Sequence, residues 1–306
     1  MVVSFYTAGD PMKSGVLWTN LTCREISELL RLHAVNAGVH IVKQLLKMCG
    51  YVKRKMVKCK TLKEVKNRNE QFEHIAQLKE GFNKEGLPVL SIDSKKKEML
   101  GNFYRDGELY TREVQKVNYH DFNSFSTGVV IPHGIYDVNK NKCCLTIGKT
   151  KDTAEFVCDN IEYHWNHSIK QLYPSAKRML ILCDGGGSNS CLHYVVKEQM
   201  QRLSERLEID IVMAHYPAYC SKWNPIEHKA FCYITKAWQG AVFDSYETVQ
   251  ELAEKATTKS GFSVKVFMNE KVYKTGEKAS EKFIENMSVE FDDFLPKWNY
   301  TFKCKS

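Results

Sequence analysis

The chain has 306 residues, of which 43% are hydrophobic and 26% are charged, and its formal net charge is +8. This length corresponds to one large domain or two ordinary ones, and the composition excludes disordered and collagen-like proteins. No apolar run reaches the roughly 18 residues of a membrane-spanning helix, and no signal-peptide pattern opens the chain, so a membrane or secreted protein is not expected. The 11 cysteines form no CxxC pair, which argues against a disulfide framework and a zinc ribbon.

The positive charge is concentrated in the first third of the chain. Residues 1–100 hold 18 Lys and Arg against 10 Asp and Glu, whereas residues 101–306 hold 26 of each kind. Residues 1–68 alone hold 13 basic and 4 acidic side chains. Because Lys and Arg release counterions from DNA phosphates, this region is a candidate for salt-dependent DNA binding.

Two short amphipathic helices are predicted within the basic region. Thr22 and Glu25 have the spacing of a capping box, which predicts a helix beginning near Cys23. A second apolar run starts at Val39, after the turn-forming segment NAG, and is stopped by Gly50. Two short helices joined by a turn that contains glycine predict a helix-turn-helix.

The basic stretch YVKRKMVKCKTLKEVKNR, residues 51–68, follows the second helix directly. It is either a strap along DNA phosphates or a solvated linker, and the sequence supports both interpretations equally. We expect DNA contacts from basic side chains of the second helix and of this stretch, namely Lys43, Lys47, Lys53, Arg54, Lys55, Lys58 and Lys60.

From residue 69 the pattern changes to that of a mixed α/β domain. A helix is predicted at 69–83, and another begins at the capping box of Asp152 and Glu155. A fully buried strand is predicted at 179–184. The other predicted elements are strands at 88–93, 127–138, 143–148 and 209–216, a helix with an apolar stripe from Leu192 to Leu207, a helix that begins near Pro225, a capped helix after Ser245, and a strand with one apolar face from Phe262 to Met268.

This order of elements, with antiparallel strands first and helical crossovers later, predicts a ribonuclease H-like mixed sheet flanked by helices. A doubly wound nucleotide-binding fold is the competing interpretation. It requires a glycine-rich turn after the first strand, which here ends in Asp93. The predicted organisation is a helix-turn-helix-like DNA-binding region and strap at 1–68, followed at 69–306 by a ribonuclease H-like domain with a C-terminal extension.

Three acidic residues fall where predicted elements end or begin. Asp93 and Asp184 each end a strand, and Glu227 lies in the first turn of the helix near Pro225. If the two strands are neighbours, the three carboxylates form a cluster suited to two magnesium ions that assist phosphoryl transfer. Each acid also has an ordinary interpretation, as a turn residue for the aspartates and as a capping-box residue for Glu227. Their joint placement favours the metal site.

Three lysines near these acids are further candidates for DNA contacts. Lys95 and Lys97 share one face of an extended strand with Asp93, where they either hold a phosphate or line a solvated edge. Lys222 precedes the helix of Glu227. The glycine-rich loop 185–189 lacks the Lys-Ser/Thr of a P-loop, so it is interpreted as a close approach to DNA or a plain turn.

Two other pairs of residues are given no chemical role. Cys220 and His215 have the types of a nucleophile and a base, but nothing in the sequence orients them. His164 and His167 are three residues apart on a helix, and both are expected at the surface.

Seven segments of the sequence are typical of one family. They are GDPM from Gly9, IDSKKKEMLGNF from Ile92, DTAEF from Asp152, YPSAKRMLILCDGGGSN from Tyr173, SKWNPIEHKAF from Ser221, TTKSGF from Thr257 and WNY from Trp298. With them the chain resembles, nearly end to end, the DDE transposases of the ISAzo group of bacterial insertion sequences. The resemblance implies a catalytic domain that cuts and joins transposon DNA with two divalent metal ions, Mg²⁺ or Mn²⁺. It also implies that the family's acidic triad is Asp93, Asp184 and Glu227.

The sequence departs from the pattern of this family in two places. Only eight residues precede Gly9, where related proteins carry a further stretch that includes a helix-turn-helix. Residues 218–220 and Pro225 replace the more usual Pro-Gly-Thr and Lys residue types.

We therefore expect a transposase that binds transposon ends and target DNA. The alternative is a truncated or domesticated transposase that binds DNA without catalysis, and a structure-specific nuclease would share the metal site but would not join DNA ends. The resemblance implies a homodimer or a larger assembly that brings two element ends together. It also implies a place in the cytoplasm at the nucleoid, or in the nucleus of a eukaryotic host.

Overall fold

The computed structural model describes residues 8–9, 17–54 and 65–304. The chain forms two compact units, Met1–Leu62 and Lys63–Ser306. Within the described ranges, no helix combines the length and the apolar character that crossing a lipid bilayer would require.

The small unit contains the two predicted helices, and the first has the predicted capping box. The backbone nitrogen of Glu25 donates to Thr22 Oγ1 at 3.2 Å, and that of Thr22 donates to Glu25 Oε2 at 2.6 Å. The turn between the helices is fixed by the Ser27 hydroxyl, which donates to the carbonyl oxygen of Ala37 at 2.6 Å. The elements of this unit are β1 (Ala8–Gly9), β2 (Leu17–Trp18), α1 (Cys23–Leu32) and α2 (Val39–Met48).

The apolar core of the small unit is thin. Ile26, Ala37 and Val42 are its buried hydrophobic residues among those described, whereas Val39 and Leu45 of α2 are 50% and 43% exposed. The predicted apolar stripe of the second helix is therefore only partly buried.

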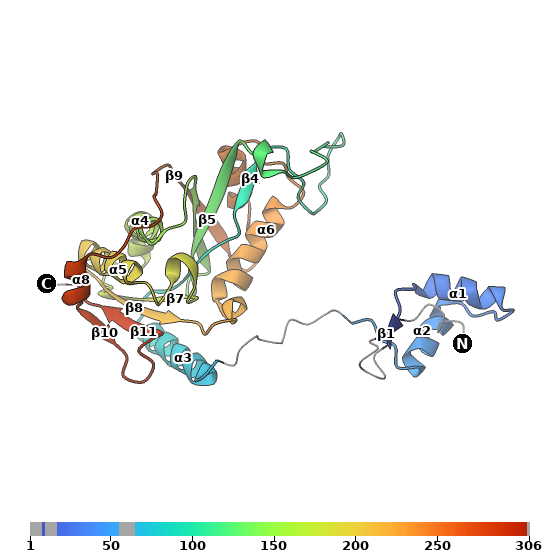
Figure 1. Ribbon diagram of the computed structural model, residues 1–306, viewed down its shortest axis with the longest axis horizontal. Coiled ribbons are helices and arrows are strands. Elements are labelled where there is room, and N and C mark those ends of the chain that lie inside the picture. The colour runs from blue at the N-terminus through green and yellow to red at the C-terminus, as the bar shows by residue number, and fades with distance from the viewer. Residues whose placement is uncertain (1–7, 10–16, 55–64, 305–306) are drawn as a thin grey trace. The chain divides into compact units, whose positions relative to one another are not determined.

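A nine-stranded mixed sheet forms the centre of the large unit (Figure 1). In spatial order its strands are β10 (Val289–Phe291), β11 (Asn299–Phe302), β8 (Asp210–His215), β7 (Arg178–Cys183), β3 (Val89–Ser94), β5 (Gly128–Asp137), β6 (Lys142–Gly148) and β9 (Ser263–Asn269), with β4 (Glu98–Leu100) paired to β5. β3, β5 and β6 pair antiparallel, and β7 and β8 continue the sheet parallel to β3. As predicted, the antiparallel strands come first along the chain and the parallel strands follow.

Helices cover both faces of this sheet (Figure 1). The α-helices are α3 (Arg68–Lys84), α4 (Ala154–His164), α5 (Tyr194–Leu207), α6 (Cys232–Trp238), α7 (Tyr246–Glu254) and α8 (Glu281–Glu285). The short helical turns are η2 (Asn123–Phe125), η3 (Trp165–Ile169), η4 (Lys170–Leu172), η5 (Gly187–Asn189), η6 (Ser221–Trp223) and η7 (Glu227–Phe231). One face packs on α4 and α5, through residues such as Ile161 and Met200, and the other packs on α3, α6 and α7, through residues such as Phe82 and Ile234.

The C-terminal segment adds strands to both sides of this sheet. β9 pairs parallel with β6 at one edge. β11 pairs antiparallel with β8 at the other edge, and β10 pairs with β11. Both outer edges of the five central strands are therefore covered by the last part of the described chain.

Two local predictions around α4 are wrong. The helix is capped by Thr153, whose hydroxyl accepts a hydrogen bond from the backbone nitrogen of Phe156 at 3.1 Å, so Asp152 lies outside the helix. His164 is only 2% exposed, because α4 turns it toward the sheet, where its Nε2 lies 2.9 Å from Thr146 Oγ1. His167 is exposed, as predicted.

Gly134 allows the helix that carries Glu227 to approach the sheet closely. It lies opposite Asp93 in the register of β3 and β5. A Cβ atom at this position would be 2.7 Å from Ile226 Cδ1 and 2.7 Å from Phe231 Cε1. Both of these side chains are buried, so an added methyl group would displace the start of the helix.

We expect Gly134→Ala to lower the free energy of unfolding of the large unit by about 1–3 kcal/mol, the usual effect of overpacking a core. Denaturant unfolding followed by circular dichroism measures the change. The control is Gly81→Ala, because Gly81 lies within α3 and a Cβ atom there meets nothing within 4 Å. That control is expected to gain about 0.5–1 kcal/mol. Similar effects of the two substitutions would argue against the close approach.

Candidate active site

Asp93 and Asp184 lie at the same edge of the sheet. β3 and β7 are parallel neighbours, and their register pairs Ser91 with Leu182. Asp93 follows Ser91 by two residues, and Asp184 follows Leu182 by two residues. Because residues two apart on a strand share a face, the two carboxylates extend the same row of side chains at the carboxyl ends of the strands.

The start of the Glu227 helix is bonded directly to β3. The hydroxyl of Ser91 donates to Asn224 Oδ1 at 2.5 Å and accepts from the backbone nitrogen of Ile226 at 2.9 Å. Asn224 Nδ2 donates to the carbonyl oxygen of Ile92 at 3.0 Å. The side chain of Asn224 thus binds the strand instead of capping the helix. A capping box with Glu227 would need this side chain as its N-cap, so the interpretation of Glu227 as a capping-box residue is not supported.

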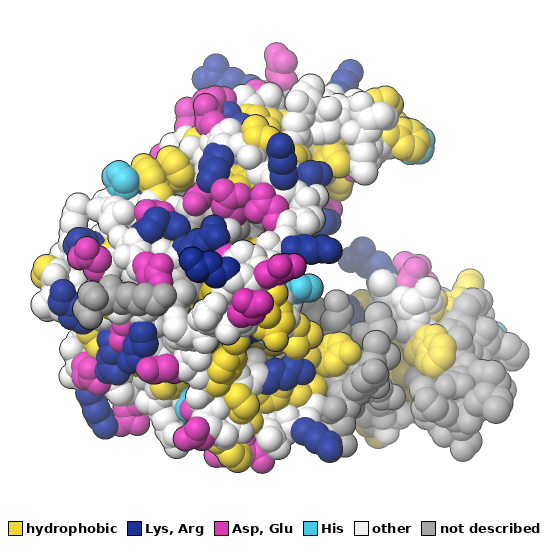
Figure 2. Space-filling view, turned by 60° about the vertical axis from the view of Figure 1, so that its left-hand side comes forward, with side chains coloured by type: hydrophobic (Ala, Val, Ile, Leu, Met, Phe, Trp, Pro, Cys, Tyr) yellow, Lys and Arg dark blue, Asp and Glu magenta, His cyan; other side chains and the backbone are white. Residues whose placement is uncertain are grey.

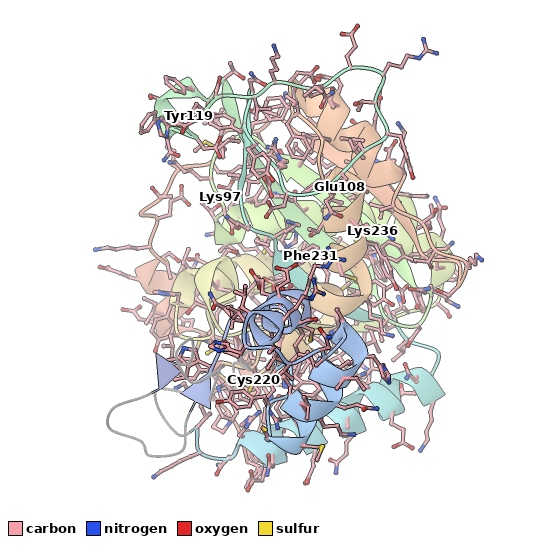
Figure 3. All side chains as sticks on the ribbon, turned by 90° about the vertical axis from the view of Figure 1, so that its right-hand side faces the viewer. Lys97, Glu108, Tyr119, Cys220, Phe231 and Lys236 are labelled. Carbon is pink, nitrogen blue, oxygen red and sulfur yellow. The ribbon has the colours of Figure 1, made fainter. Side chains whose placement is uncertain are left out.

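Glu227 begins a π-helical turn, η7, which runs into α6. Phe231 and Lys236, labelled in Figure 3, mark the course of this helix. π-helical turns within α-helices are rare and occur often at functional sites, because the extra residue per turn redirects a side chain.

The three acids act on one another electrostatically. The pKa of Asp93 is raised from 3.8 to about 8, mainly by burial, and also by the charges of Asp184 and Glu227 and by a hydrogen bond with the Glu227 side chain. The backbone nitrogen of Ser94 donates to Asp93 Oδ1 at 2.8 Å and opposes this shift. At neutral pH and without a cation, Asp93 therefore carries a proton.

A fourth acid lies near Asp184. Burial raises the pKa of Asp184, the charge of Asp152 raises it as well, and a hydrogen bond from the backbone nitrogen of Gly186 at 3.3 Å lowers it. The displacement of Asp152 from the start of α4 places its carboxylate close enough to act on this site.

His215 supports the backbone of Asp184. Its Nδ1 lies 2.9 Å from the carbonyl oxygen of Asp184, and its Nε2 lies 2.6 Å from the hydroxyl of Tyr300. Burial lowers the pKa of His215 to about 4, so the ring is neutral. Because a carbonyl oxygen only accepts, Nδ1 carries the hydrogen and Nε2 accepts from Tyr300.

The chemistry of these acids fits divalent cations. Carboxylate oxygens are the ligands that Mg²⁺ and Mn²⁺ prefer. The repulsion that raises the pKa of Asp93 is the effect that a bound cation reverses. Among the residues that the structure describes, no three His, Cys, Asp or Glu side chains form a ready-made metal cage.

The prediction that Lys95 shares an extended strand with Asp93 is wrong, because β3 ends at Ser94 and β4 begins only at Glu98. Its ammonium nitrogen lies 3.7 Å from Glu98 Oε1 and 5.3 Å from the ring centroid of Trp238. Burial lowers its pKa, and the charge of Glu98 opposes this shift. The charge of Lys95 is therefore directed to protein groups.

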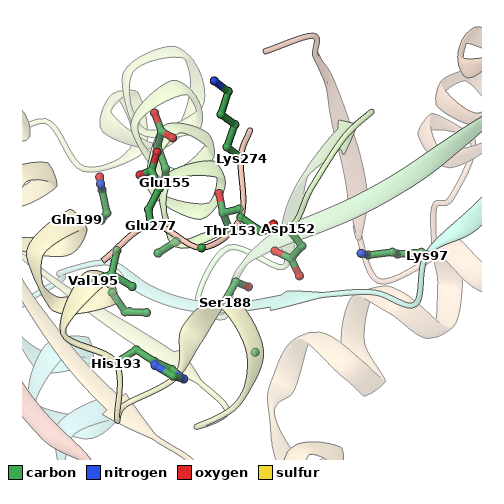
Figure 4. A pocket seen from close by; sticks show the side chains of 15 residues that line it. Lys97, Asp152, Thr153, Glu155, Ser188, His193, Val195, Gln199, Lys274 and Glu277 are labelled. Atoms are coloured by element: carbon green, nitrogen blue, oxygen red, sulfur yellow. The ribbon is translucent and has the colours of Figure 1, made fainter. Parts of the chain in front are cut away.

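Lys97 is exposed and lines a pocket with a volume of about 390 Å³ (Figure 4). Asp152 and Ser188 line the same pocket, and so do His193 and Lys274 from neighbouring segments. Ser188 belongs to the glycine-rich loop that follows Asp184, so the pocket adjoins the acidic cluster. It offers both cationic and acidic groups to a molecule that approaches the acids.

Of the remaining candidate DNA contacts, five lie among the residues that the structure describes. Lys43, Lys47, Lys53 and Arg54 are exposed in the small unit. Lys222 is exposed on the large unit, with its ammonium nitrogen 5.6 Å from the ring centroid of Trp223. Lys55, Lys58 and Lys60 lie outside the described residues. On the face of the large unit that Figure 2 shows, basic and acidic side chains are interspersed.

Cys220 and His215 are not partners. The sulfur of Cys220 is buried and accepts from Arg68 Nε at 3.2 Å, whereas the ring of His215 is bonded to Asp184 and Tyr300. The residue before Cys220 is Tyr219, whose φ of 63° is left-handed. Glycine adopts this backbone conformation more readily than tyrosine does.

The residues that support the acids were not among those predicted from the sequence. Ser91 is one polar residue in an apolar strand, and His215 ends another strand. A buried polar residue one or two positions from a catalytic candidate is the signal that could have found them. Tyr300 and Asn224 lie in the segments WNY and SKWNPIEHKAF, which carry the family resemblance.

Comparison with known families and proteins agrees with these features. The model of a family described as the Rhodopirellula transposase DDE domain matches residues 1–304. No curated protein matches the sequence.

Solved structures of Mos1 transposase resemble this chain. The Mos1 strand transfer complex has a TM-score of 0.50 at 15% identity and covers 79% of this chain and 68% of the Mos1 chain. The Mos1 mariner paired end complex with Mn has a TM-score of 0.46 at 16% identity, with 76% and 65% covered. The chain thus spans about two thirds of the length of Mos1 transposase. With the strand order, the likeness to the strand transfer complex confirms the predicted ribonuclease H-like fold.

The pKa of Asp93 predicts how stability depends on pH. Between pH 4 and 8 the folded protein holds a proton that the unfolded chain has released, so the free energy of unfolding falls as the pH rises through this range. Thermal unfolding in EDTA at several pH values measures the fall. Asp93→Asn should flatten the profile, and Mg²⁺ at pH 8 should raise the melting temperature of the unmodified chain more than that of this variant. If the pH profiles of the unmodified chain and of Asp93→Asn superimpose, Asp93 does not hold the predicted proton.

The bond network at Ser91 predicts a second effect. Ser91→Ala leaves Asn224 Oδ1 and the backbone nitrogen of Ile226 buried without this partner, at a cost of about 1–3 kcal/mol per unsatisfied group. We expect a lower free energy of unfolding in denaturant titrations. The control is Ser190→Ala, because the Ser190 hydroxyl accepts a local hydrogen bond from the backbone nitrogen of Leu192, two residues away, at 3.3 Å. A loss in Ser91→Ala no larger than in the control would contradict the network.

Proposed function

Because this chain belongs to the family of the Rhodopirellula transposase DDE domain, we propose that it catalyses metal-dependent cleavage and strand transfer of transposon-end DNA. One observation carries this proposal most directly. Asp93, Asp184 and Glu227 come from two strands and a helix, yet burial and their mutual repulsion raise the pKa of Asp93 to about 8. Acids gathered in this way need a cation before DNA phosphates can approach.

We assign the binding of Mg²⁺ or Mn²⁺ to the same three carboxylates. Bound cations supply activation of the attacking oxygen and neutralisation of charge on the leaving oxygen in phosphoryl transfer. Ser91 and Asn224 hold the helix of Glu227 against the strand of Asp93. Water attacks the phosphate in cleavage, and a DNA 3'-hydroxyl attacks it in strand transfer, so no protein nucleophile is required.

DNA binding is assigned mainly to the small unit. Between Glu28 and Glu64 the sequence contains no acidic residue. The exposed Lys43, Lys47 and Arg54 therefore present positive charge that no neighbouring acid in the sequence offsets, which favours contact with phosphates. The remaining candidates in this region, Lys53, Lys55, Lys58 and Lys60, are proposed to act in the same way.

Two lysines of the large unit are proposed to contact DNA near the acids. Lys97 lines the pocket beside the glycine-rich loop, and Lys222 lies on the segment that leads to Glu227. We further propose that two or more copies of the chain assemble to hold two element ends. The protein then acts where DNA is held, at the bacterial nucleoid or in a eukaryotic nucleus.

The decisive substitution is Glu227→Gln, which keeps the size of the side chain and removes its negative charge. We expect cleavage of DNA fragments that span the element ends to fall by at least about 100-fold in Mg²⁺, the upper end of the loss caused by changes around metal ligands. Gel analysis of labelled fragments measures cleavage and joining. The control is Glu251→Gln, an exposed acid of α7, which should leave both reactions unchanged.

Each other result of this assay has a definite meaning. Full activity of Glu227→Gln would remove Glu227 from the metal site. Cleavage without joining by the unmodified chain would identify a structure-specific nuclease. DNA binding without any cleavage in Mg²⁺ or Mn²⁺ would identify a DNA-binding protein that lacks catalysis.

A further inference from the structure

We propose that Trp223 and Tyr219 form a stacking platform for an unpaired base of the DNA strand held at the acids. Both residues lie between β8 and η7, on the segment that leads to Glu227. The proposal rests on the proposed function for the position of the DNA. It adds a group of residues that contact the bases beside the reacting phosphate.

Both aromatic side chains are open to solvent. Trp223 is 52% exposed and Tyr219 is 54% exposed, although the residues around them, Cys220 and Asn224, are buried. An aromatic ring with an open face next to a nucleic-acid site is a surface on which a base can stack. A base that is paired within a duplex cannot use it, because its faces are covered by neighbouring base pairs.

The segment that presents these rings is well anchored. The buried sulfur of Cys220, labelled in Figure 3, accepts from Arg68 Nε at 3.2 Å. The backbone nitrogen of Trp223 donates to the carbonyl oxygen of Cys220 at 2.8 Å, and that of Asn224 donates to Ser221 at 2.8 Å. Ring positions that are fixed before binding lose little freedom when a base stacks on them.

Trp223 is also fixed by its aromatic neighbours. Its ring meets that of Phe72 nearly edge to face, with the centroids 6.2 Å apart and an angle of 79° between the planes. Phe72 in turn packs against the buried Tyr216 at 5.8 Å. The platform is thus continuous with the core that joins α3 to the sheet.

The conformation of Tyr219 is a second sign of function. Its φ of 63° is left-handed, a region that residues with a Cβ atom rarely occupy. A tyrosine in this conformation is strained, and such strain persists most often at sites of binding or catalysis.

Chain geometry keeps the platform close to the reacting phosphate. Trp223 precedes Glu227 by four residues, so their Cα atoms are no more than about 15 Å apart. Neighbouring nucleotides of a duplex strand are about 3.4 Å apart along the axis, so this span covers about four nucleotides. A base close to the reacting phosphate therefore lies within reach of the ring.

Lys222 adds a charge that suits the backbone of the same strand. Its ammonium nitrogen lies 5.6 Å from the ring centroid of Trp223 and is exposed. A ring for the base beside a cation for the phosphate is the combination that proteins use for single strands, and it tolerates any base sequence.

The test compares single-stranded with duplex DNA in EDTA, so that no cleavage interferes. The probes are a fluorescein-labelled 12-nucleotide oligothymidine and a labelled hairpin duplex, and the full chain is titrated into each while anisotropy is read. Trp223→Ala should weaken binding of the single strand by about 5- to 150-fold, the loss of one stacked base, and should leave duplex binding unchanged. Trp223→Phe should retain most of the affinity.

Tyr219→Gly is the second variant, because glycine suits the left-handed backbone and folding is not at risk. It should weaken single-strand binding while the melting temperature stays equal or rises. The control is Phe294→Ala, since Phe294 is 65% exposed on the connection between β10 and β11, and it should bind both probes like the unmodified chain.

The proposal is overturned if Trp223→Ala binds the oligothymidine like the unmodified chain, or if it loses single-strand and duplex affinity equally. The same holds if Trp223→Phe is as weak as Trp223→Ala. Because these titrations need no metal and no reaction, the platform and the proposed catalysis can fail separately. Unchanged cleavage by the triad with no effect at Trp223 would reject only the platform.

Discussion

The hydroxyl of Ser91 is the contact on which the candidate active site depends. It joins the strand that carries Asp93 to the residues that begin the helix of Glu227, and Asn224 repeats the connection through Ile92. Buried hydrogen bonds of this kind are strong because water cannot replace either partner. They oppose the repulsion between carboxylates, which otherwise would separate strand and helix.

The close approach at Gly134 acts together with this network. The hydrogen bonds fix the start of the helix along the strand, and the missing side chain at Gly134 fixes its height above the sheet. Position along the strand and height above it are both needed to bring Glu227 next to Asp93. A site built on a sheet and a bonded helix is more rigid than one built on loops.

Much of this arrangement could be predicted from the sequence, because alternating apolar patterns define strands and parallel strands end at one edge. Asp93 and Asp184 are in this class. The positions of Lys95 and His164 could not be predicted, because they depend on where β3 ends and on how α4 is rotated against the sheet. The bond between His215 and Tyr300 joins residues 85 positions apart and depends on the order of the strands.

The place of β11 in the sheet has a consequence for the synthesis of the protein. Tyr300 completes the support of Asp184 through His215, and the ribosome adds it 85 residues after His215. At about 5–20 residues per second, this interval lasts about 4–17 seconds. During that time the growing chain already contains all three acids but lacks the strand that steadies one of them. The support of Asp184 is therefore incomplete until translation has passed β11.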